Sequence, residues 1–266
     1  REGGHRLENL MRIVNAIEDS EREELNRAAH YLHLRCELIH PETLRLFRSL
    51  MDNPRLKLVS LMDHSPGQRQ YTSLEKYREY NIGKYNFTDE QMAAHEEYTS
   101  GLAAQWSQPN REAIARLCRE KNIAMASHDD ATAEHVEESC ALGMKVAEFP
   151  TTPEAAKHSH ERGLYVVMGA PNVVRGGSHS GNVSAWELAA EGTLHILSSD
   201  YYPASLADAV FTLAEDERNA LVLSDAAALV SRHPASVVGF HDRGRISEGM
   251  RGALVLICRQ THRSHV

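Results

Sequence analysis

Several kinds of residue and motif are scarce in this sequence, and each shortage excludes a class of protein. Only four of its 266 residues are cysteines: Cys36, Cys118, Cys140 and Cys258. They are widely spaced and form no CxxC pair, which argues against a zinc knuckle or a disulfide framework. Scattered reduced thiols are typical of the cytoplasm, so we expect a cytoplasmic protein.

Positive charge and long apolar runs are also scarce. The 29 Lys and Arg residues are outnumbered by 37 Asp and Glu residues, giving a formal net charge of −8. A general nucleic-acid partner is therefore not expected. No apolar run approaches the roughly 18–20 residues that span a bilayer, so we expect no membrane partner, and no signal peptide is recognised. No GxGxxG follows the first expected strand, which weakens a dinucleotide-binding interpretation, and the absence of a Walker A motif excludes an ordinary P-loop ATPase.

The sequence does contain an alternation of apolar and amphipathic segments. With 42% hydrophobic residues, the chain can bury one sizeable core. Six segments predict strands, at residues 31–38, 56–62, 123–128, 145–149, 164–169 and 195–200. Helical patterns cover 5–24, 88–106, the surroundings of 114–118, 133–143, 153–163, 184–191, 204–215 and 224–232. This order implies a parallel α/β sheet with right-handed crossovers, either doubly wound or six-eighths of a (β/α)8 barrel.

Residues 68–108 interrupt the alternation of strands and helices. This insertion is rich in aromatic and basic residues, and Thr88–Gln91 forms a capping box that predicts the start of a helix. Long insertions after a strand commonly serve as lids or binding loops. Arg69, Lys76 and Lys84 lie in it and are candidates for binding phosphate, although such charges more often form a solvated surface.

Four expected strands end in side chains that can bind a divalent cation: Glu37, His64, His128 and Asp200. A single such ending is readily explained as a helix cap or a turn, and Glu37 could instead pair with Arg35 or Arg69. Four endings on parallel strands, however, would converge on one mouth of a barrel. The mixed nitrogen and oxygen donors suit one or two ions of zinc or manganese. Asp200 could alternatively act as a general base.

A glycine-containing stretch, Gly169–Asn182, is the second candidate site. Its glycines would let backbone amides approach a ligand, and Asn172, Arg175 and His179 add donors and positive charge. Such a loop can hold phosphate oxygens, but a flexible glycine turn is an equally simple interpretation.

Six segments in this order resemble one family of the amidohydrolase superfamily, the ribose 1-methylphosphonate 5-triphosphate diphosphatases of the carbon–phosphorus lyase pathway. The segments are Leu34–Leu38, Leu61–Gln70, Ala126–Thr132, Ala147–Thr152, Gly169–Asn182 and Leu197–Leu206. The resemblance implies a metal-dependent hydrolase with a (β/α)8 barrel that releases diphosphate from the 5-triphosphate of a ribose 1-alkylphosphonate. It matches Glu37, His64, His128 and Asp200 to metal-binding positions, with His128 and Asp200 also expected to take part in catalysis.

The chain departs from this family pattern at its beginning. The histidine pair expected at the end of the first barrel strand is missing, so the barrel would lack its first two strands and retain about six of eight. We expect a partial barrel at 1–238, and a partial β-sandwich at 239–266 with returning strands at 244–257. An open seam between strand edges is an aggregation liability, and a homo-oligomer is compatible with the sequence. A chain of this extent is expected to be poorly active or inactive.

Two other interpretations remain open from the sequence. One is an amidohydrolase that acts on a C–N bond, as a deaminase or deacylase does, whose substrate would not need a cluster of cations. The other is a non-catalytic component or an inactive fragment, which metal analysis would separate from an intact site.

Overall fold

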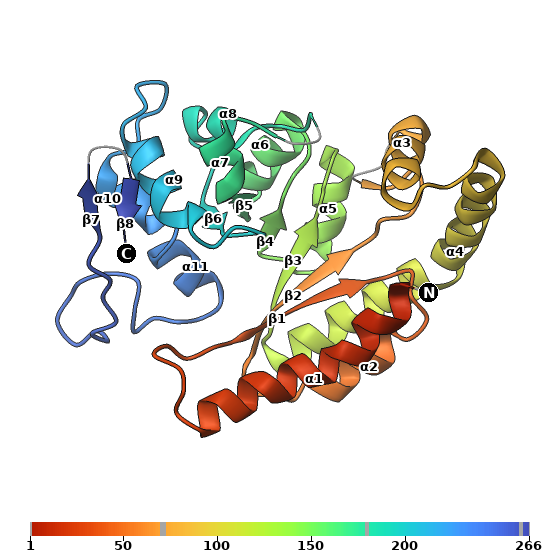
Figure 1. Ribbon diagram of the computed structural model, residues 1–266, viewed down its shortest axis with the longest axis horizontal. Coiled ribbons are helices and arrows are strands. Elements are labelled where there is room, and N and C mark those ends of the chain that lie inside the picture. The colour runs from red at the N-terminus through yellow and green to blue at the C-terminus, as the bar shows by residue number, and fades with distance from the viewer. Residues whose placement is uncertain (1, 70–72, 179–180, 261–262, 266) are drawn as a thin grey trace.

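Six parallel strands form the sheet that positions the candidate site. The structure is a computed structural model that describes residues 2–69, 73–178, 181–260 and 263–265. The strands follow one another across the sheet in chain order, as expected. Their bounds are β1 Leu32–Glu37, β2 Leu56–Met62, β3 Ala124–His128, β4 Val146–Glu148, β5 Tyr165–Gly169 and β6 Ile196–Ser198. Each strand pairs in parallel with the next, so all six carboxyl ends lie along one edge (Figure 1).

The helices cover the outer face of the curled sheet (Figure 1). Around β1 to β3 they are α1 Glu2–Arg22, α2 Thr43–Leu50 and the end of α4 Asp89–Lys121, and further along the sheet α5 Ala133–Ala141, α6 Pro153–Glu161, α7 Ala170–Arg175, α8 Ala185–Ala190 and α9 Ser205–Ala214. Alternate strand residues such as Val59, Leu61 and Val166 face outward into two apolar cores against these helices. The six parallel strands in chain order, with helices on the outer face, correspond to six units of a (β/α)8 barrel, as the sequence predicts.

The inner face of the sheet carries the other half of each strand's residues. Ala126, Val146, Val167 and Ile196 form a small apolar cluster there. Because side chains alternate along a strand, His128, two residues after Ala126, and Glu148, two residues after Val146, lie on the same inner face. These candidate site residues therefore lie on the concave face of the sheet, next to the apolar cluster.

The insertion is a helical hairpin made of α3 (Leu74–Tyr85) and the first part of α4. The prediction of separate helices before and after residue 108 was wrong, because α4 is one helix of 33 residues. Pro109 lies inside it, and an internal proline costs about 3 kcal/mol. Asn110, the next residue, ties the helix to the loop after β1, since its side-chain amide donates to the backbone oxygens of Leu38 (2.8 Å) and His40 (3.2 Å).

The C-terminal part differs from the sequence-based expectation. After α10 (Leu223–Ala228) and α11 (Arg232–Val237), residues 244–257 contain none of the expected strands. A short hairpin follows instead, formed by β7 (Cys258–Gln260) and β8 (Arg263–His265). The exposed side chains of 251–257 explain the error, because an apolar alternating pattern forms a strand only where another strand or a core covers it. Within the described residues, none of the helices combines the length and apolar character that crossing a membrane requires.

Candidate functional site

Two histidines and an aspartate meet at the carboxyl ends of β2 and β3. His64, two residues after β2, and His128, the last residue of β3, have imidazole rings with centroids 5.6 Å apart. Asp129 Oδ2 lies 3.6 Å from Nε2 of His64 and 3.4 Å from Nε2 of His128. The donor atoms of this group, which we call the donor cluster, all lie within 4.8 Å of one another.

The backbone at Asp129 explains how a strand ending brings its carboxylate into the cluster. Asp129 has a left-handed φ of 56°, a conformation that short polar side chains tolerate better than most. Its amide donates to the carbonyl of Glu148 at 3.0 Å, which ties the turn after β3 to β4. The turn redirects the chain, so that consecutive residues His128 and Asp129 both face the cluster.

A second carboxylate holds each histidine from the other side of its ring. Oε2 of Glu37 lies 2.5 Å from Nδ1 of His64, while its Oε1 accepts from the His64 backbone amide at 3.2 Å. Oε2 of Glu148 lies 2.7 Å from Nδ1 of His128. Both imidazoles therefore turn Nε2 toward Asp129.

These contacts shift the protonation of two groups. Burial lowers the pKa of His64, but hydrogen bonds to Asp129 and Glu37 outweigh it and raise the pKa to about 10. Burial raises the pKa of Glu148, but contacts led by the hydrogen bond from His128 outweigh it and lower the pKa to about 2. Glu148 is therefore an ionised acceptor at neutral pH.

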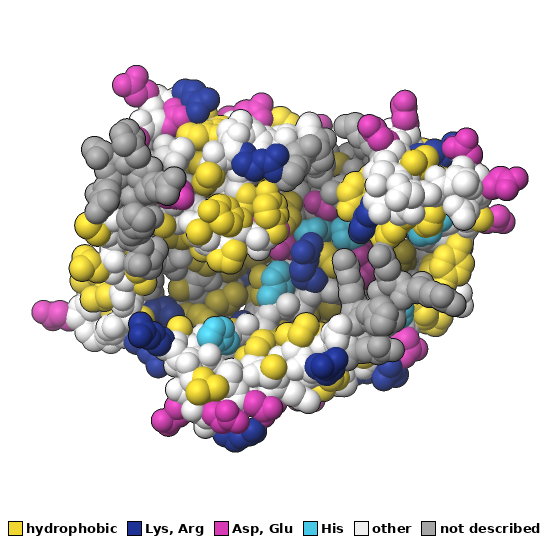
Figure 2. Space-filling model, in the orientation of Figure 1, with side chains coloured by type: hydrophobic (Ala, Val, Ile, Leu, Met, Phe, Trp, Pro, Cys, Tyr) yellow, Lys and Arg dark blue, Asp and Glu magenta, His cyan; other side chains and the backbone are white. Residues whose placement is uncertain are grey.

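A guanidinium group occupies the open side of His128. Nη2 of Arg35 lies 3.0 Å from Nε2 of His128, and its Nε donates to the sulfur of Met62 at 3.2 Å. Arg35 lies on the exposed edge strand β1, so its side chain reaches the cluster from the solvent-facing side. Figure 2 shows histidine side chains and a basic side chain gathered in the central hollow of the molecule.

The donor cluster has the chemistry that a divalent cation requires. Two imidazole nitrogens and a carboxylate oxygen are a common set for zinc. Donors on one tetrahedral zinc ion lie about 3.3 Å apart for bonds of about 2 Å, close to the 3.4 and 3.6 Å that separate Asp129 from the two histidines. The cationic guanidinium of Arg35 stands at Nε2 of His128 and marks this position as one that favours positive charge.

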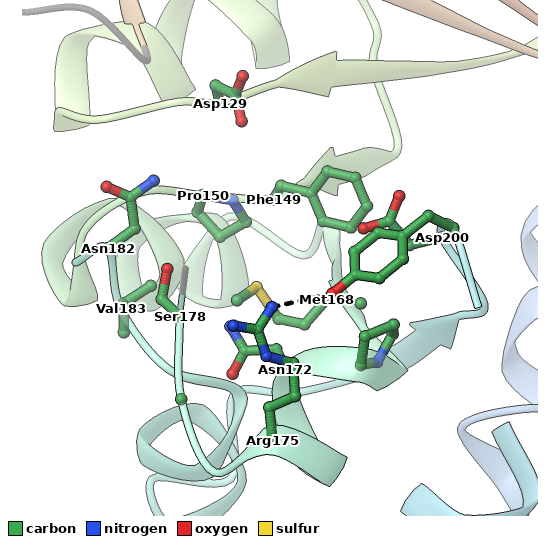
Figure 3. Close-up of a pocket in the computed structure, with 14 residues that line it drawn as sticks. Asp129, Phe149, Pro150, Met168, Asn172, Arg175, Ser178, Asn182, Val183 and Asp200 are labelled. Atoms are coloured by element: carbon green, nitrogen blue, oxygen red, sulfur yellow. Dashed lines mark hydrogen bonds between the residues drawn. The ribbon is translucent and has the colours of Figure 1, made fainter. Parts of the chain in front are cut away.

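A pocket of about 190 Å³ adjoins the cluster and is lined by two of the six predicted phosphate-binding residues, Asn172 and Arg175. Asp129, Asp200, Asn172 and Arg175 all line it. Figure 3 shows Asn172 and Arg175 pointing into the pocket from α7, with Asp129 on the opposite side. Asp200 lies near the tyrosine ring to which Arg175 is hydrogen-bonded. Nη1 of Arg175 donates to the hydroxyl of Tyr201 at 3.2 Å.

Asp200 reaches this pocket through a turn after β6. It is exposed, has a left-handed φ of 48°, and lies outside the donor cluster found among the described residues. The structure thus places Asp200 beside the cluster without joining the two.

The expected glycine loop at Gly169–Asn182 is half helix. Ala170–Arg175 forms α7, which Gly176 ends in a left-handed conformation with φ 81°. Pro171 explains the difference, because proline is well suited to the first turn of a helix. His179 lies outside the described residues.

The three basic residues of the insertion that were predicted to bind phosphate lie in different surroundings. Arg69 is almost fully buried and forms ion pairs with Asp130 and with Glu138, the latter at 2.7 Å. Its charge is thus balanced within the protein, and we propose no phosphate-binding role for it. Lys84 is exposed on α3, with its ammonium 4.9 Å from the ring centre of Tyr85. Lys76 is also on α3, but its side chain lies outside the described residues.

Comparison with known proteins decides the family. The chain is 58% identical over all of its 266 residues to the alpha-D-ribose 1-methylphosphonate 5-triphosphate diphosphatase of Escherichia coli (strain K12), of which it covers 70%. The chain belongs to this diphosphatase family. No protein-family profile matches it.

Solved structures resemble the chain only distantly. An uncharacterised metal-dependent hydrolase from Pyrococcus furiosus is 13% identical, with a TM-score of 0.43 over 54% of this chain and 35% of that one. A dihydropyrimidinase from Brevibacillus agri NCHU1002 is also 13% identical, with a TM-score of 0.36 over 90% of this chain and 56% of that one.

The sequence-based prediction gave no role to three polar residues of the candidate site. Asp129 completes the donor cluster, Glu148 holds His128, and Arg35 contacts the same histidine. Glu148 satisfies the same criterion that selected Glu37 and His128, since it is the last residue of a strand. Applying that criterion to all six strands would have found it.

Proposed function

We propose that this chain is the catalytic part of a metal-dependent phosphohydrolase that releases diphosphate from an α-D-ribose 1-alkylphosphonate 5-triphosphate. The observation that carries this proposal is the donor cluster of His64, His128 and Asp129 beside a pocket that presents Arg175. The E. coli relative bears the name of the corresponding diphosphatase, and this supports the choice of substrate.

His64, His128 and Asp129 would hold a divalent ion, zinc or manganese. Glu37, which contacts His64, and Asp200, which lines the same pocket as Asp129, would contribute further oxygens after a side-chain movement. The ion would supply Lewis-acid polarisation of a phosphoryl oxygen. Glu37 and Glu148 orient the two imidazoles, and Asp129 balances positive charge between them.

The pocket residues would bind and orient the triphosphate. Arg175 offers a planar array of donors for phosphate oxygens, and its bond to Tyr201 keeps it directed into the pocket. The amide oxygen of Asn172 accepts from the backbone of Ala185 at 2.9 Å, and its NH2 group would donate to a phosphate oxygen. Asp200, exposed at the rim, would accept the proton of the attacking water as general base.

Product analysis under single-turnover conditions tests this function, because enzyme in excess reveals even slow chemistry. The chain, dialysed against zinc or manganese, is incubated with ribose 1-methylphosphonate 5-triphosphate, and diphosphate and the 5-phosphate product are quantified. We expect equal amounts of the two, and far less with His128→Asn. Formation of orthophosphate alone, or ammonia and carboxylate release from amino-base and N-acyl substrates instead, would overturn the proposal.

We also propose the division of the chain at residue 238. Residues 1–238 would form the catalytic barrel part and 239–266 a separate C-terminal segment. The exposed side chains of residues 251–257 support this division, since they contribute nothing to the barrel cores. We further propose a cytoplasmic location, in agreement with the scattered thiols, and a homo-oligomer is compatible with the open edge of β1.

A further inference from the structure

The proton on His128 can be located from its neighbours. Arginine has only N–H donors and no acceptor, so the contact between Arg35 Nη2 and His128 Nε2 requires Nε2 to be the acceptor. The proton of the neutral ring is then on Nδ1, where the Glu148 carboxylate accepts it at 2.7 Å. His128 is thus held with the Nε2 lone pair directed into the donor cluster.

Glu148 is itself held by a chain of hydrogen bonds that crosses four strands. Ser60 on β2 donates its hydroxyl proton to Oε2 of Glu148 at 2.8 Å. Having given that proton, Ser60 must accept from Nε2 of His33 on β1, which lies 2.6 Å away. His33, Ser60 and His128 therefore all donate toward Glu148, and we call these four residues the relay.

The fold builds the relay from sheet register. His128 is the direct partner of Glu148 across β3 and β4, and both side chains lie on the inner face of the sheet. Ser60 is completely buried, His128 is 4% exposed and Glu148 is 9% exposed. A buried carboxylate costs several kcal/mol unless it is paired, and Oε2 of Glu148 is paired with both Ser60 and His128.

Glu148 cannot be a ligand of the ion that the donor cluster would hold. Its carboxylate is bonded to Nδ1 of His128, whereas Asp129 lies at Nε2 on the other side of the same ring. The two ring nitrogens point away from each other, so one ion cannot reach both positions.

We propose that Glu148 is a positioning residue for the metal centre, acting through His128 and supported by Ser60 and His33. It fixes the ring orientation and the Nδ1–H tautomer and so presents Nε2 to the cation. This inference rests on the metal centre of the proposed function. Removing such an outer carboxylate typically weakens metal binding about 10- to 100-fold.

Metal affinity, measured by competition with a chromophoric chelator at 25 °C, tests the proposal without reference to catalysis. The 266-residue chain and its variants are titrated with Co2+ and Zn2+, and the visible Co2+ spectrum reports the ligand set. We expect Glu148→Gln to bind about 10- to 100-fold more weakly than the wild type, with an altered Co2+ spectrum. Ser60→Ala keeps the carboxylate and should lose several-fold.

Two control variants separate positioning from general stability. Glu96→Gln removes a carboxylate in the insertion that accepts hydrogen bonds from Arg78 at 2.6 and 2.8 Å. This variant should bind metal as tightly as the wild type does. Leu188→Ala opens a cavity in the outer core and should lower the melting temperature without changing metal affinity.

The possible outcomes separate the positioning role of Glu148 from the metal centre itself. A wild-type chain that binds neither ion would overturn the metal centre and the proposed function with it. Metal binding by the wild type and, equally tightly, by both Glu148→Gln and Ser60→Ala would overturn the relay alone. If Glu148→Gln fails to fold, Ser60→Ala decides between these results.

Discussion

We predict that His195, at the end of the sheet opposite the candidate site, makes the stability of this protein sensitive to mild acid. Its backbone amide donates to Val166 at 3.0 Å, and the Val166 amide donates back to Nδ1 of the His195 ring at 3.1 Å. The ring thus replaces a backbone acceptor between β5 and β6. Nε2 then carries the proton and donates to His160 on α6 at 3.2 Å, while His233 on α11 lies 2.7 Å from the His195 carbonyl and Tyr165 packs on the ring.

Protonation of His195 would place a proton on Nδ1, the ring nitrogen that accepts the hydrogen bond from the Val166 amide. Burial, followed by the charges of His160 and His233, lowers its pKa from 6.5 to about 4. In the unfolded chain the group binds its proton near pH 6.5, so the folded state binds fewer protons between these values. Its contribution is therefore complete above pH 6.5 and is lost as the pH falls toward 4.

The expected loss follows from the size of the shift. A decrease from 6.5 to about 4 would correspond to about 3.4 kcal/mol at 1.36 kcal/mol per pH unit. The ring is only half-buried, and solvent screening reduces the figure to about 1.5 kcal/mol. Replacement by asparagine keeps a side-chain acceptor for Val166 but removes the titration.

Urea unfolding at several pH values between 7 and 4 measures this loss. The stability of the wild type relative to His195→Asn should fall by about 1.5 kcal/mol across that range, with the steepest change below pH 6.5. The exposed His241 provides the matched control, and His241→Asn should follow the wild type at every pH. A constant difference between wild type and His195→Asn would refute the assignment of the acid sensitivity to this ring.

Three further predictions concern other side chains. Arg69→Met should lower the free energy of unfolding by about 3–5 kcal/mol in urea titrations, because it leaves the buried Asp130 carboxylate unpaired; a loss below about 1 kcal/mol would contradict this, since that is the range of surface pairs. Arg35→Gln should strengthen zinc binding about five- to tenfold in chelator competition, because it removes a cation bonded to Nε2 of His128; unchanged or weaker binding would show that the two do not compete. Asn110→Ala should cost about 1–3 kcal/mol by thermal or urea unfolding, because two backbone oxygens after β1 lose their donor; a neutral effect would mean that water replaces it.

The amino-acid sequence was sufficient to predict the parallel sheet and to place His64 and His128 at the edge where its carboxyl ends lie. Short apolar runs separated by helical patterns specify parallel strands, and parallel strands bring their carboxyl ends together. His64 and His128 could therefore be placed close to each other from the positions of their strands along the chain, and their rings do meet. The start of a helix that carries a capping signal was also predictable. Thr152, for example, caps the start of α6, and its side chain accepts from the amide of Ala155.

Other features depend on contacts that a sequence does not contain. Whether α4 continues past Pro109 is decided by the packing of its second half against the strands, not by helix propensity. Arg69 and Arg175 are indistinguishable as letters in a sequence. One is buried against Asp130, and the other lines a pocket. Charge predicts that a partner exists, and only the fold decides whether that partner is the protein or a ligand.

Glu37 shows most clearly how the fold refines a residue-level hypothesis. The sequence suggested a metal ligand or a partner of Arg35 or Arg69, whereas both of its carboxylate oxygens contact His64. In this arrangement Glu37 does for His64 what Glu148 does for His128, and Nε2 of each ring faces Asp129. The two carboxylates differ in surroundings, since Glu148 is fixed by the buried Ser60 while the side chain of Glu37 is 33% exposed. Glu37 therefore keeps the freedom to turn toward an ion, and Glu148 does not.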